Sequence, residues 1–370
     1  MKYLRMILMF FVLVSSSLVS TTHCVDGKRN ISKAEANDME IEKKLRILNK
    51  EPVKTIITEV GDTIDCINIY KQPAFDNPLL KDHKLKERCP LGTIPIRIKT
   101  KKQLLNAKYF ITKSKSIYEN SYPNIGYHFV FAEEIVIGKR YFGGAAFMSG
   151  HNLTVDPNQF STSQIWIMNA TEQEINTIEF GIMKHPEVFG DSLTRLFGSW
   201  IRGHQIYGCY NVLCNGFIQV SYDVFFGQTF SQSSIYGQVS YDVYLMVSKD
   251  LDGDWWLSMG PNAEATENIG YWPYEILTLL RTSASAVRYG GYVGATSQAA
   301  TPPMVNGYLP QLGDYMKTTF MRKMKYTNEM GGLVNLYPHS VRTINGTVPQ
   351  CYNVMFAGHI GSWENTMAYG

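Results

Sequence analysis

Glu179 is the residue of this chain whose type and setting point most directly to chemistry. It stands between Ile178 and Phe180 in an apolar run typical of a buried strand, where an ionised carboxylate without partners is costly. Burial raises the pKa of a carboxyl group, and a raised pKa lets one group take and return a proton. The residues alone leave two interpretations open: a catalytic acid or base, or a structural Glu that caps a loop or pairs with Arg195.

The amino-acid composition narrows the classes of protein to which this chain can belong. The chain has 370 residues, of which 45% are hydrophobic and 18% charged, which suffices for a sizeable core and about two domains. The net charge of +3 provides no electrostatic case for a nucleic-acid or anionic-membrane partner. Aromatic residues reach 13%, and short Tyr-rich and Gly-rich apolar runs favour an all-β domain.

The elements that must position Glu179 are short strands. Apolar-aromatic runs separated by turn residues continue from residue 127 to residue 294, a spacing typical of antiparallel sheets packed as a sandwich. Before them, residues 31–50 have the apolar spacing of an amphipathic helix, and a second helix is expected to begin near Tyr274. We therefore predict a mainly β fold, with an antiparallel β-sandwich domain preceded by a small α+β module. No strands are assigned beyond Gly294.

The N-terminus has the layout of a secretory leader. Lys2 and Arg5 precede an apolar run over residues 6–14 and then small residues, so residues 1–24 are expected to be a signal peptide. A secreted, extracellular protein is expected to carry glycans on its Asn-x-Ser/Thr sites, which are Asn30, Asn152, Asn169 and Asn345.

Secretion also places the cysteines in an oxidising compartment. Cys209 and Cys214 flank four residues and are predicted to close a small disulfide loop. Cys66 and Cys89 bracket a loop rich in Pro and Lys, and we pair them by elimination. Cys351 is left without a predicted partner.

No metal or cofactor site is expected. Asp250, Asp252 and Asp254 alternate as in a calcium loop, but Pro261 stands where the bidentate Glu would be required, and a hairpin turn is favoured. No second Cys or His pair has zinc-ligand spacing, and the fingerprints of nucleotide and dinucleotide binding are absent from the sequence.

Several motifs in fixed order resemble those of one family. "TIEFG", "HPEVFGD", "TRLF", "GCYNVLCNGFIQV", "GDWWL" and "GYWP" are similar in type and order to motifs of the neprosin-like proteins of plants. The resemblance implies a secreted glutamic peptidase with an N-terminal activation peptide, a β-sandwich catalytic domain and a preference for cleaving at proline. It covers nearly the whole chain after the leader.

The resemblance also implies a domain order. The stretches "IYKQPAFDNPLLKDH" and "CPLGTIPIR" are similar to the neprosin activation peptide, so residues 25–115 are expected to be a pro-domain that covers the active site until it is removed in acid. Residues 116–370 are then the catalytic domain. A charged module held by carboxylates would loosen as those carboxylates become protonated.

The family mechanism rests on two glutamates that share a proton. The first matches Glu179, whereas the second, in the family pattern W-G-G-E-V, corresponds to Tyr292 in "YGGYV". A phenol, with an ordinary pKa of about 10, cannot supply a carboxylate in acid. Two substitutes remain open: Glu275 leaning into the cleft instead of stabilising a helix N-terminus, or Tyr292 donating a proton while Glu179 alone acts as base.

Four further residues are candidates for lining the cleft. Trp256 and Trp272 offer aromatic faces on which proline rings pack well, and Gln164 and Tyr241 are polar positions on apolar strands that could orient a substrate. For each of them a place in the sandwich core remains the structural alternative.

Two functions follow from these expectations. The first is a secreted endopeptidase acting at acid pH on proline-containing peptides, with its own propeptide as a partner and neither nucleic acid nor a membrane span involved. The second is an inactive secreted glycoprotein of the apoplast or cell wall that binds Pro-rich peptides or cell-wall proteins. A glycoside-cleaving sandwich would also use paired carboxylates, but no motif supports it.

Overall fold

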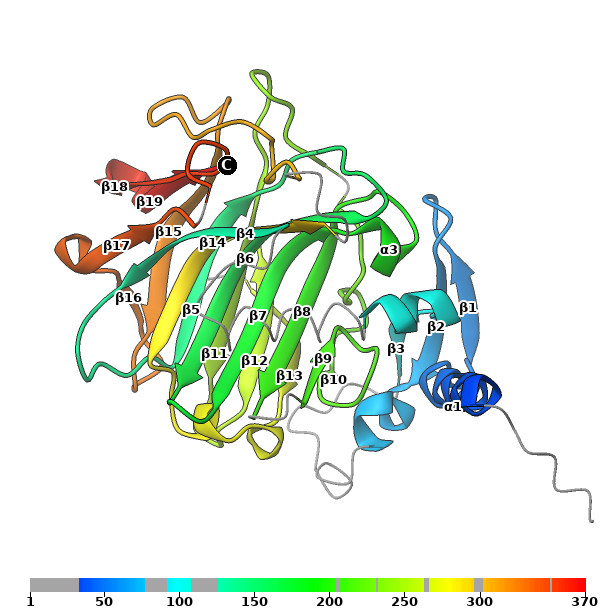
Figure 1. Cartoon of the computed structure of the whole chain (residues 1–370). Helices are drawn as coiled ribbons and strands as arrows, with labels where there is room; N and C mark the ends of the chain where they lie inside the picture. The colour runs from blue at the N-terminus through cyan, green and yellow to red at the C-terminus, as the bar shows by residue number, and fades with distance from the viewer. Residues whose placement is uncertain are drawn as a thin grey trace, which may run out of the picture. The chain divides into compact units, whose positions relative to one another are not determined.

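Short strands form two large antiparallel sheets in this protein (Figure 1). Successive side chains along each strand point to opposite faces of its sheet. The computed structural model describes residues 33–76, 92–107, 126–203, 207–230, 232–262, 266–295, 302–346 and 348–370. The predicted leader, Asn30 and Cys89 lie outside these residues. The described part from residue 41 onward forms one compact unit.

The first large sheet carries Glu179. It has seven strands in the order β17-β4-β14-β6-β7-β8-β9. Their bounds are β4 (Tyr127–Glu134), β6 (Gln159–Ala170), β7 (Ile175–Lys184), β8 (Arg195–Arg202), β9 (Tyr207–Tyr210), β14 (Ala286–Ala295) and β17 (Val341–Ile344).

The second large sheet has nine strands, in the order β10-β13-β12-β11-β5-β15-β19-β18, with β16 paired to β15. Their bounds are β5 (Gly143–Ser149), β10 (Ile218–Gln219), β11 (Asp242–Lys249), β12 (Trp255–Gly260), β13 (Glu267–Trp272), β15 (Thr319–Thr327), β16 (Leu333–Asn335), β18 (Val354–Ile360) and β19 (Glu364–Tyr369). The predicted antiparallel β-sandwich is thus confirmed.

The two faces of the seven-stranded sheet differ in what they contact. The inner face, which includes Ile178, Phe180 and Ile182 of β7, packs into the main core between the sheets. At Gly144 of β5 the sheets approach so closely that a Cβ atom would lie 2.6 Å from Cγ1 of Val287. We call the opposite side the outer face; it has a hydrophobic cluster of its own, which includes Phe131, Phe160, Trp166, Met183, Phe197, Tyr210 and Tyr292.

The N-terminal part is a small α+β module, as predicted. It contains helix α1 (Lys33–Leu48) and a three-stranded sheet in the order β1-β2-β3. The strands are β1 (Lys54–Ile57), β2 (Thr63–Asn68) and β3 (Thr93–Arg97). Short 3-10 turns η1 (Ile69–Lys71) and η2 (Pro73–Asp76) follow β2, and residues 101–107 are helical.

Two local expectations have different outcomes. The helix expected near Tyr274 is wrong, because the chain instead forms two 3-10 turns, η4 (Tyr274–Ile276) and η5 (Leu279–Arg281). The Asn176 side-chain carbonyl accepts hydrogen bonds from the backbone N–H groups of Thr278 and Leu280 and holds this irregular path. The predicted hairpin turn between β11 and β12 is confirmed, since the two strands pair antiparallel.

The remaining elements are short. They are α3 (Pro186–Phe189), η6 (Pro338–Ser340) and η7 (Gly361–Trp363). Beyond Gly294, five strands complete the two sheets, although the sequence did not allow them to be assigned. Among the described residues, no helix has the length and apolar character needed to cross a membrane.

Cys209 and Cys214 form a disulfide with a Cα–Cα distance of 5.7 Å. The pairing predicted for Cys66 remains a prediction, because Cys89 lies outside the described residues. Cys351 is exposed.

The predicted glycan sites differ in their surroundings. Asn152 is exposed and Asn345 is half-buried. The side-chain nitrogen of Asn169, to which a glycan would be attached, instead donates hydrogen bonds to the backbone carbonyls of Ser283, at 2.8 Å, and Leu279, at 3.4 Å. The folded structure therefore opposes a glycan at Asn169, because its attachment would remove contacts that hold η5.

When the full chain is expressed in glycosylating cells, we expect Asn152 to carry a glycan and Asn169 to be unmodified. Peptide mapping by mass spectrometry, with and without enzymatic deglycosylation, measures both sites in one sample. Full occupancy of Asn169 in folded protein would contradict the hydrogen-bonding role assigned to its side chain.

Candidate active site

Glu179 lies on the outer face of β7 and is only 7% exposed. One carboxylate oxygen, Oε2, accepts a hydrogen bond of 3.0 Å from Nε2 of Gln164, and the other, Oε1, accepts one of 3.3 Å from the Thr177 hydroxyl. Arg195, the alternative partner considered from the sequence, binds Asp62 and Asp191 instead. Glu179 is therefore a buried carboxylate that accepts hydrogen bonds from two neutral donors, Gln164 and Thr177.

The strand register identifies every same-face neighbour of Glu179. Trp166 of β6 and Ser199 of β8 lie directly opposite, and the remaining neighbours lie two residues along the same or adjacent strands. The full set of eight is Trp166, Ser199, Thr177, Gly181, Gln164, Met168, Phe197 and Ile201. None of these is Asp or Glu, so no second carboxylate adjoins Glu179 in the sheet.

Tyr292 lies on the same outer face as Glu179 but outside its transverse row, so the pairing of position 292 with Glu179 stays a prediction. Tyr292 pairs with Thr162 on β6, two strands and four residues away, which corresponds to about 16 Å between Cα atoms on a flat sheet. Its ring packs against Phe160, at 4.9 Å between centroids, and Tyr127, at 6.2 Å. Gln164 lies on the diagonal between Glu179 and Tyr292.

Gln164 is the predicted residue that the structure brings to Glu179. Its partners in the register are Gly181 and Gly290, so no side chain flanks it on either side. A Cβ atom would lie 2.1 Å from the Ser163 carbonyl oxygen at Gly181, and 1.9 Å from the Val130 oxygen at Gly290. Gln164 Oε1 is buried and has no hydrogen-bond partner among the described residues, so it can accept a bond from a water or a substrate N–H.

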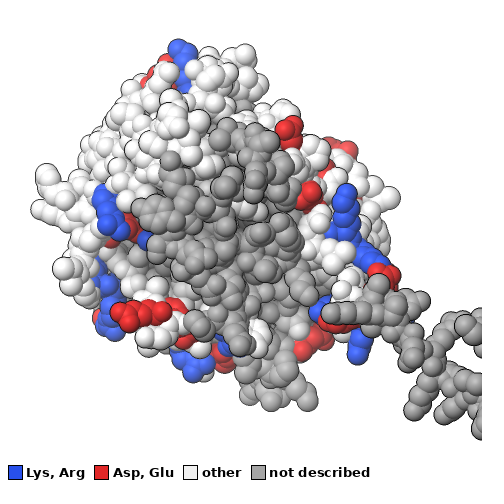
Figure 2. Space-filling model, viewed as in Figure 1, with Lys and Arg blue, Asp and Glu red and all other residues white. Residues whose placement is uncertain are grey.

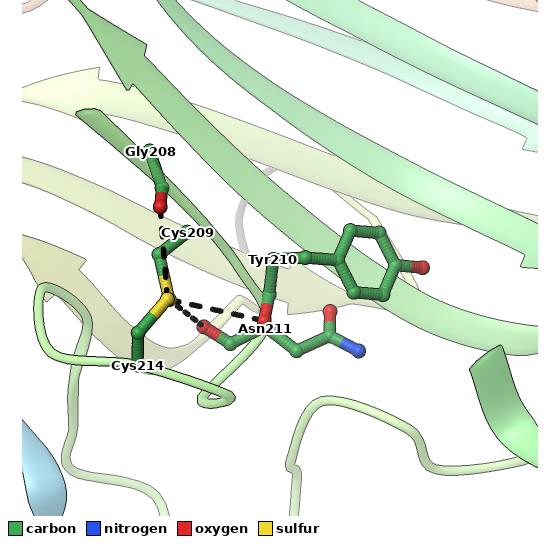
Figure 3. The surroundings of a disulfide bond; sticks show 5 residues. All are labelled: Gly208, Cys209, Tyr210, Asn211 and Cys214. Carbon is green, nitrogen blue, oxygen red and sulfur yellow. Dashed lines mark hydrogen bonds between the residues drawn. A yellow bond between two sulfur atoms is a disulfide. The ribbon is translucent and has the colours of Figure 1, made fainter. Parts of the chain in front are cut away.

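Tyr210, at the end of β9, lies in the same transverse row as Glu179 and Ser199. Burial, with a contribution from the charge of Glu179, raises its pKa well above the ordinary value. The phenol therefore stays protonated, and it donates a hydrogen bond to the sulfur of Met183 at 2.8 Å. The Cys209–Cys214 disulfide anchors this end of β9, with the Tyr210 ring directed away from it (Figure 3).

The other candidates for lining the cleft do not join Glu179. Trp256 and Trp272 belong to the core between the sheets, where Trp256 stacks on Tyr271 at 4.5 Å. Tyr241 lines a cavity that also contains the inner-face residue Ile182. Trp256 and Trp272 therefore take the structural alternative in the core, whereas Tyr241 is exposed at that cavity.

Glu275 is also remote from the outer face. It lies in η4, where its charge acts on Tyr271 of the nine-stranded sheet together with those of Asp254 and Asp250. The proposal that Glu275 leans toward Glu179 is therefore not supported. Among the described residues, no cluster of three or more His, Cys, Asp or Glu side chains is arranged to hold a metal ion.

Among the residues near Glu179 that were not predicted are Thr177 and Trp166, and Tyr210 in the same transverse row. Thr177 could have been found from the two-residue period of β7, because Thr177 and Glu179 must share a face. Trp166 follows from a hairpin centred on residues 171–174, which pairs position 166 with 179. Tyr210 has no such local signal, because its place depends on the pairing of β8 with β9.

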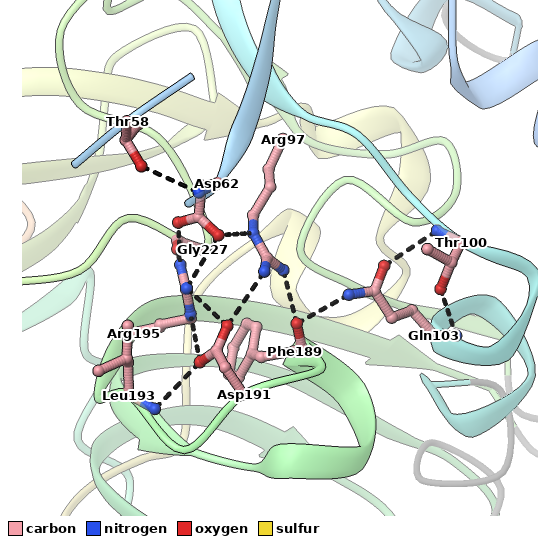
Figure 4. A network of polar contacts seen from close by, with 10 residues as sticks. All are labelled: Thr58, Asp62, Arg97, Thr100, Gln103, Phe189, Asp191, Leu193, Arg195 and Gly227. Carbon is pink, nitrogen blue, oxygen red and sulfur yellow. Dashed lines mark hydrogen bonds and ion pairs between the residues drawn. The ribbon is translucent and has the colours of Figure 1, made fainter. Parts of the chain in front are cut away.

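A buried ion cluster joins the N-terminal module to the seven-stranded sheet (Figure 4). Arg195 of β8 is fully buried and binds both oxygens of Asp62 in the β1–β2 turn, at 2.7 and 3.0 Å. Arg97 of β3 also binds Asp62, at 2.7 Å, and both arginines contact Asp191. Burial would raise the pKa of Asp62, but its hydrogen bonds to Arg195 and Arg97 outweigh this, and the pKa lies below the ordinary value of 3.8.

Neutral hydrogen bonds extend this junction. Gln103 and Arg97 both donate to the Phe189 carbonyl at the end of α3, and Gln72 exchanges two hydrogen bonds with the backbone of Gln219 in β10. Arg195 is paired with Met183 in the register, so the cluster lies on the same outer face as Glu179. The module is thus attached at the β8–β9 side of that face.

Charge elsewhere is dispersed. In the view of Figure 2, Lys and Arg side chains alternate with Asp and Glu among uncharged residues. Among the described residues visible in this view, no surface has the single-sign character expected of a nucleic-acid-binding face.

The fold and the site define an antiparallel β-sandwich with a buried glutamate presented on the outer face of one sheet. Residues 157–370 match the Neprosin family and residues 55–88 match the Neprosin activation peptide. The chain belongs to the neprosin family, and it carries the activation peptide of that family.

Solved structures with similar folds include two peptidases. Scytalido-glutamic peptidase with a transition state analog inhibitor is 10% identical, with 66% of this chain and 98% of that chain covered and a TM-score of 0.40. SCP-B, a member of the Eqolisin family in a complex with the tripeptide Ala-Ile-His, is 9% identical, with 67% and 98% covered and a TM-score of 0.37.

Replacing Asp62 by Asn should loosen the module at neutral pH, because Arg195 would remain buried with half of its countercharge; removing one member of a buried ion pair costs about 3–5 kcal/mol. In the full native chain the same loosening should appear only in acid. Since the folded pKa of Asp62 is depressed, its contribution is complete above about pH 3.8 and is lost as the pH falls through that lower pKa.

Hydrogen exchange of the β1–β3 amides in the full chain measures both effects. Asp76→Asn is the matched control, because Asp76 lies in the same module but forms a largely exposed ion pair with Lys50. Equal protection of β1–β3 in Asp62→Asn and Asp76→Asn would contradict the role given to the cluster.

Proposed function

We propose that this chain is the secreted precursor of a peptidase that hydrolyses proline-containing peptides, with Glu179 as the base that activates water. The observation that carries the proposal is the buried, hydrogen-bonded pair of Glu179 and Gln164 on the outer face. A carboxylate so placed can take a proton from a water molecule, and a fixed amide beside it controls which oxygen does so. Membership of the neprosin family supports the same reaction.

The proposed reaction needs one carboxylate. Glu179 removes a proton from water as the water oxygen attacks the scissile carbonyl carbon. The carbon–nitrogen bond then breaks, and the proton held by Glu179 passes to the leaving nitrogen, which yields an acid and an amine. Gln164 orients the Glu179 carboxylate through its N–H group, and Tyr210 in the same row, kept protonated by burial, would donate to the developing oxyanion by giving up its bond to Met183.

Aromatic side chains on the outer face support a preference for proline. Trp166 lies directly opposite Glu179, and Phe131 lies 6.3 Å from it between ring centroids. A pyrrolidine ring packs well on such faces and has no N–H group that would require a partner.

In this proposal acid is needed to release the module and not for the hydrolysis step itself. The Asp62 cluster holds the module on the outer face at neutral pH and weakens below about pH 3.8. In this proposal acid releases the module and exposes the peptidase, consistent with a secreted precursor that reaches an acidic extracellular space.

A second candidate is a secreted protein that binds Pro-rich peptides without hydrolysing them. The observation that favours it is the sequence at position 292, where Tyr stands in place of the second glutamate of the family pattern, together with the lack of any carboxylate among the same-face neighbours of Glu179. This candidate retains the same outer face and the same activation module.

Acid-treated full chain should cleave a proline-containing peptide, and Glu179→Gln should lower the rate by about 10²–10⁴-fold, the range for loss of a general base. Glu275→Gln is the matched control, because it makes the same change at a half-buried glutamate remote from the outer face, and it should leave the rate unchanged. Cleavage is followed by mass spectrometry of the products.

The variant Tyr292→Glu separates the two candidates. Activity in the native chain that is lost in Glu179→Gln supports the one-carboxylate peptidase. A silent native chain that gains activity in Tyr292→Glu would show instead that hydrolysis requires a carboxylate at position 292, which would leave the binding protein as the function.

A further inference from the structure

A single row of side chains crosses the whole outer face at the level of Glu179. The register places direct partners next to one another from β17 to β9. In order across the sheet the row is Arg342, Glu133, Arg288, Trp166, Glu179, Ser199 and Tyr210. One end of the row, at the β4–β17 side, thus carries two arginines around one glutamate.

Arg288 and Arg342 together carry more positive charge than their shared partner Glu133 neutralises. Glu133 is 3% exposed and accepts from Nε of Arg288 at 2.6 Å and from Nη2 of Arg342 at 2.6 Å. The side chains of Arg288 and Arg342 are 28% and 55% exposed. Two cations around one carboxylate leave a net charge of one, on a surface that solvent reaches.

Part of the hydrogen-bonding capacity of these guanidinium groups is unused. Neither Nη1 nor Nη2 of Arg288, and not Nη1 of Arg342, donates a hydrogen bond to any residue that the structure describes. The Arg288 guanidinium lies over the Phe131 ring, with 4.3 Å from Cζ to the centroid, which fixes its plane. A planar, pre-positioned fork of N–H donors is the group that recognises a carboxylate best.

We propose that Arg288 and Arg342 form a carboxylate-binding subsite for the peptide whose backbone is presented to Glu179. The ligand is either an Asp or Glu side chain or the terminal carboxylate of that peptide. This inference rests on the proposed function, because it assumes that a peptide lies along the row. Arg288, Arg342 and the supporting Glu133 are specificity residues and take no part in bond cleavage.

The spacing along the row sets where the carboxylate must be. Arg288 lies two strands from Glu179, and its guanidinium points one strand further, toward Glu133, which amounts to about 14 Å at 4.8 Å between strands. An extended peptide advances about 3.3 Å per residue, so the carboxylate lies about four residues from the bond to be cleaved. Trp166 lies between the two points, and Phe131 packs against the Arg288 guanidinium at the far one.

A purely structural role explains less of this arrangement. One arginine suffices to neutralise Glu133, and the contact with half-exposed Arg342 contributes little to stability. The activation module is attached at the opposite, β8–β9 side of the sheet, so its described contacts do not involve either arginine. The unused charge therefore faces solvent at the end of the row, where a substrate would extend.

The test measures peptide binding to the full chain carrying Glu179→Gln, which cannot hydrolyse the ligand, and Asp62→Asn, which loosens the module at neutral pH. Three versions of one proline-containing peptide are compared by calorimetry at about pH 6, where carboxylates are ionised. One has Glu four residues beyond the proline and an amidated end, one has Gln there and an amidated end, and one has Gln there and a free C-terminal carboxylate.

Arg342→Gln should weaken binding of the acidic peptides about tenfold, as expected for loss of one charge-assisted contact, and leave the Gln peptide unchanged. Because removal of both arginines would leave the buried Glu133 carboxylate without a cation, Arg288→Gln/Arg342→Gln is combined with Glu133→Gln, and this triple variant should bind all three peptides alike. Arg140→Gln is the control, since Arg140 also pairs with a glutamate and lies over an aromatic ring, but outside the row.

Each outcome decides the proposal. A preference for the Glu peptide or for the free C-terminus that disappears in Arg342→Gln, but persists in Arg140→Gln, supports it and identifies the source of the carboxylate. Equal binding of all three peptides by the chain with both arginines, or a preference that survives in the triple variant, overturns it. Hydrolysis by the chain with Glu179 restored is measured separately, so a failure of the peptidase function is distinguishable from a failure of the subsite.

Discussion

The pairing of β6 with β7 is the constraint on which the site depends. Side chains alternate between the two faces of a sheet, so a shift of one residue in this hairpin would turn Glu179 into the core and bring Ile178 to the outer face. The inner-face residues Ile178, Phe180 and Ile182 oppose that shift, because it would expose them and bury an unpaired charge. The same register brings Gln164 within hydrogen-bond distance of Glu179. Packing of the core thereby sets the geometry of the candidate catalytic pair.

The ion cluster that holds the module and the pair Arg288 and Arg342 lie at opposite sides of the outer face, with Glu179 between them. The module is held through Arg195 at the β8–β9 side, two residue rows from Glu179, by charges that compensate one another in a buried cluster. Such clusters contribute little net stability compared with apolar packing, but they respond to protonation, which apolar packing does not. The excess charge of Arg288 and Arg342 lies at the other side, next to β17. Glu179 stands between a contact that responds to acid and a surface suited to an anionic ligand.

Local patterns were sufficient for much of the fold and for both members of the candidate pair, Glu179 and Gln164. The alternation in β7 and the turn after Ala170 place Glu179 and its β6 neighbours on one face, and the motif resemblance identifies Glu179 itself. The position of Tyr292 could not be predicted, because it depends on the pairing of β14 with β6, about 120 residues away in the chain. Apolar spacing near Tyr274 correctly indicated buried residues but not their conformation, since the Asn176 side chain replaces the hydrogen bonds of a helix.

The number of carboxyl groups that titrate in catalysis tests the account most directly. The measurement is the dependence of kcat/KM on pH for acid-matured protein, assayed with one proline-containing peptide from strong acid to neutral pH. A single base predicts a rate that rises through one ionisation and then stays constant toward neutrality, because acid serves only to release the module. A bell-shaped profile with two ionisations in the acid range would show that a second carboxylate shares the proton, and would contradict the pairing of Glu179 with Gln164 as the catalytic centre.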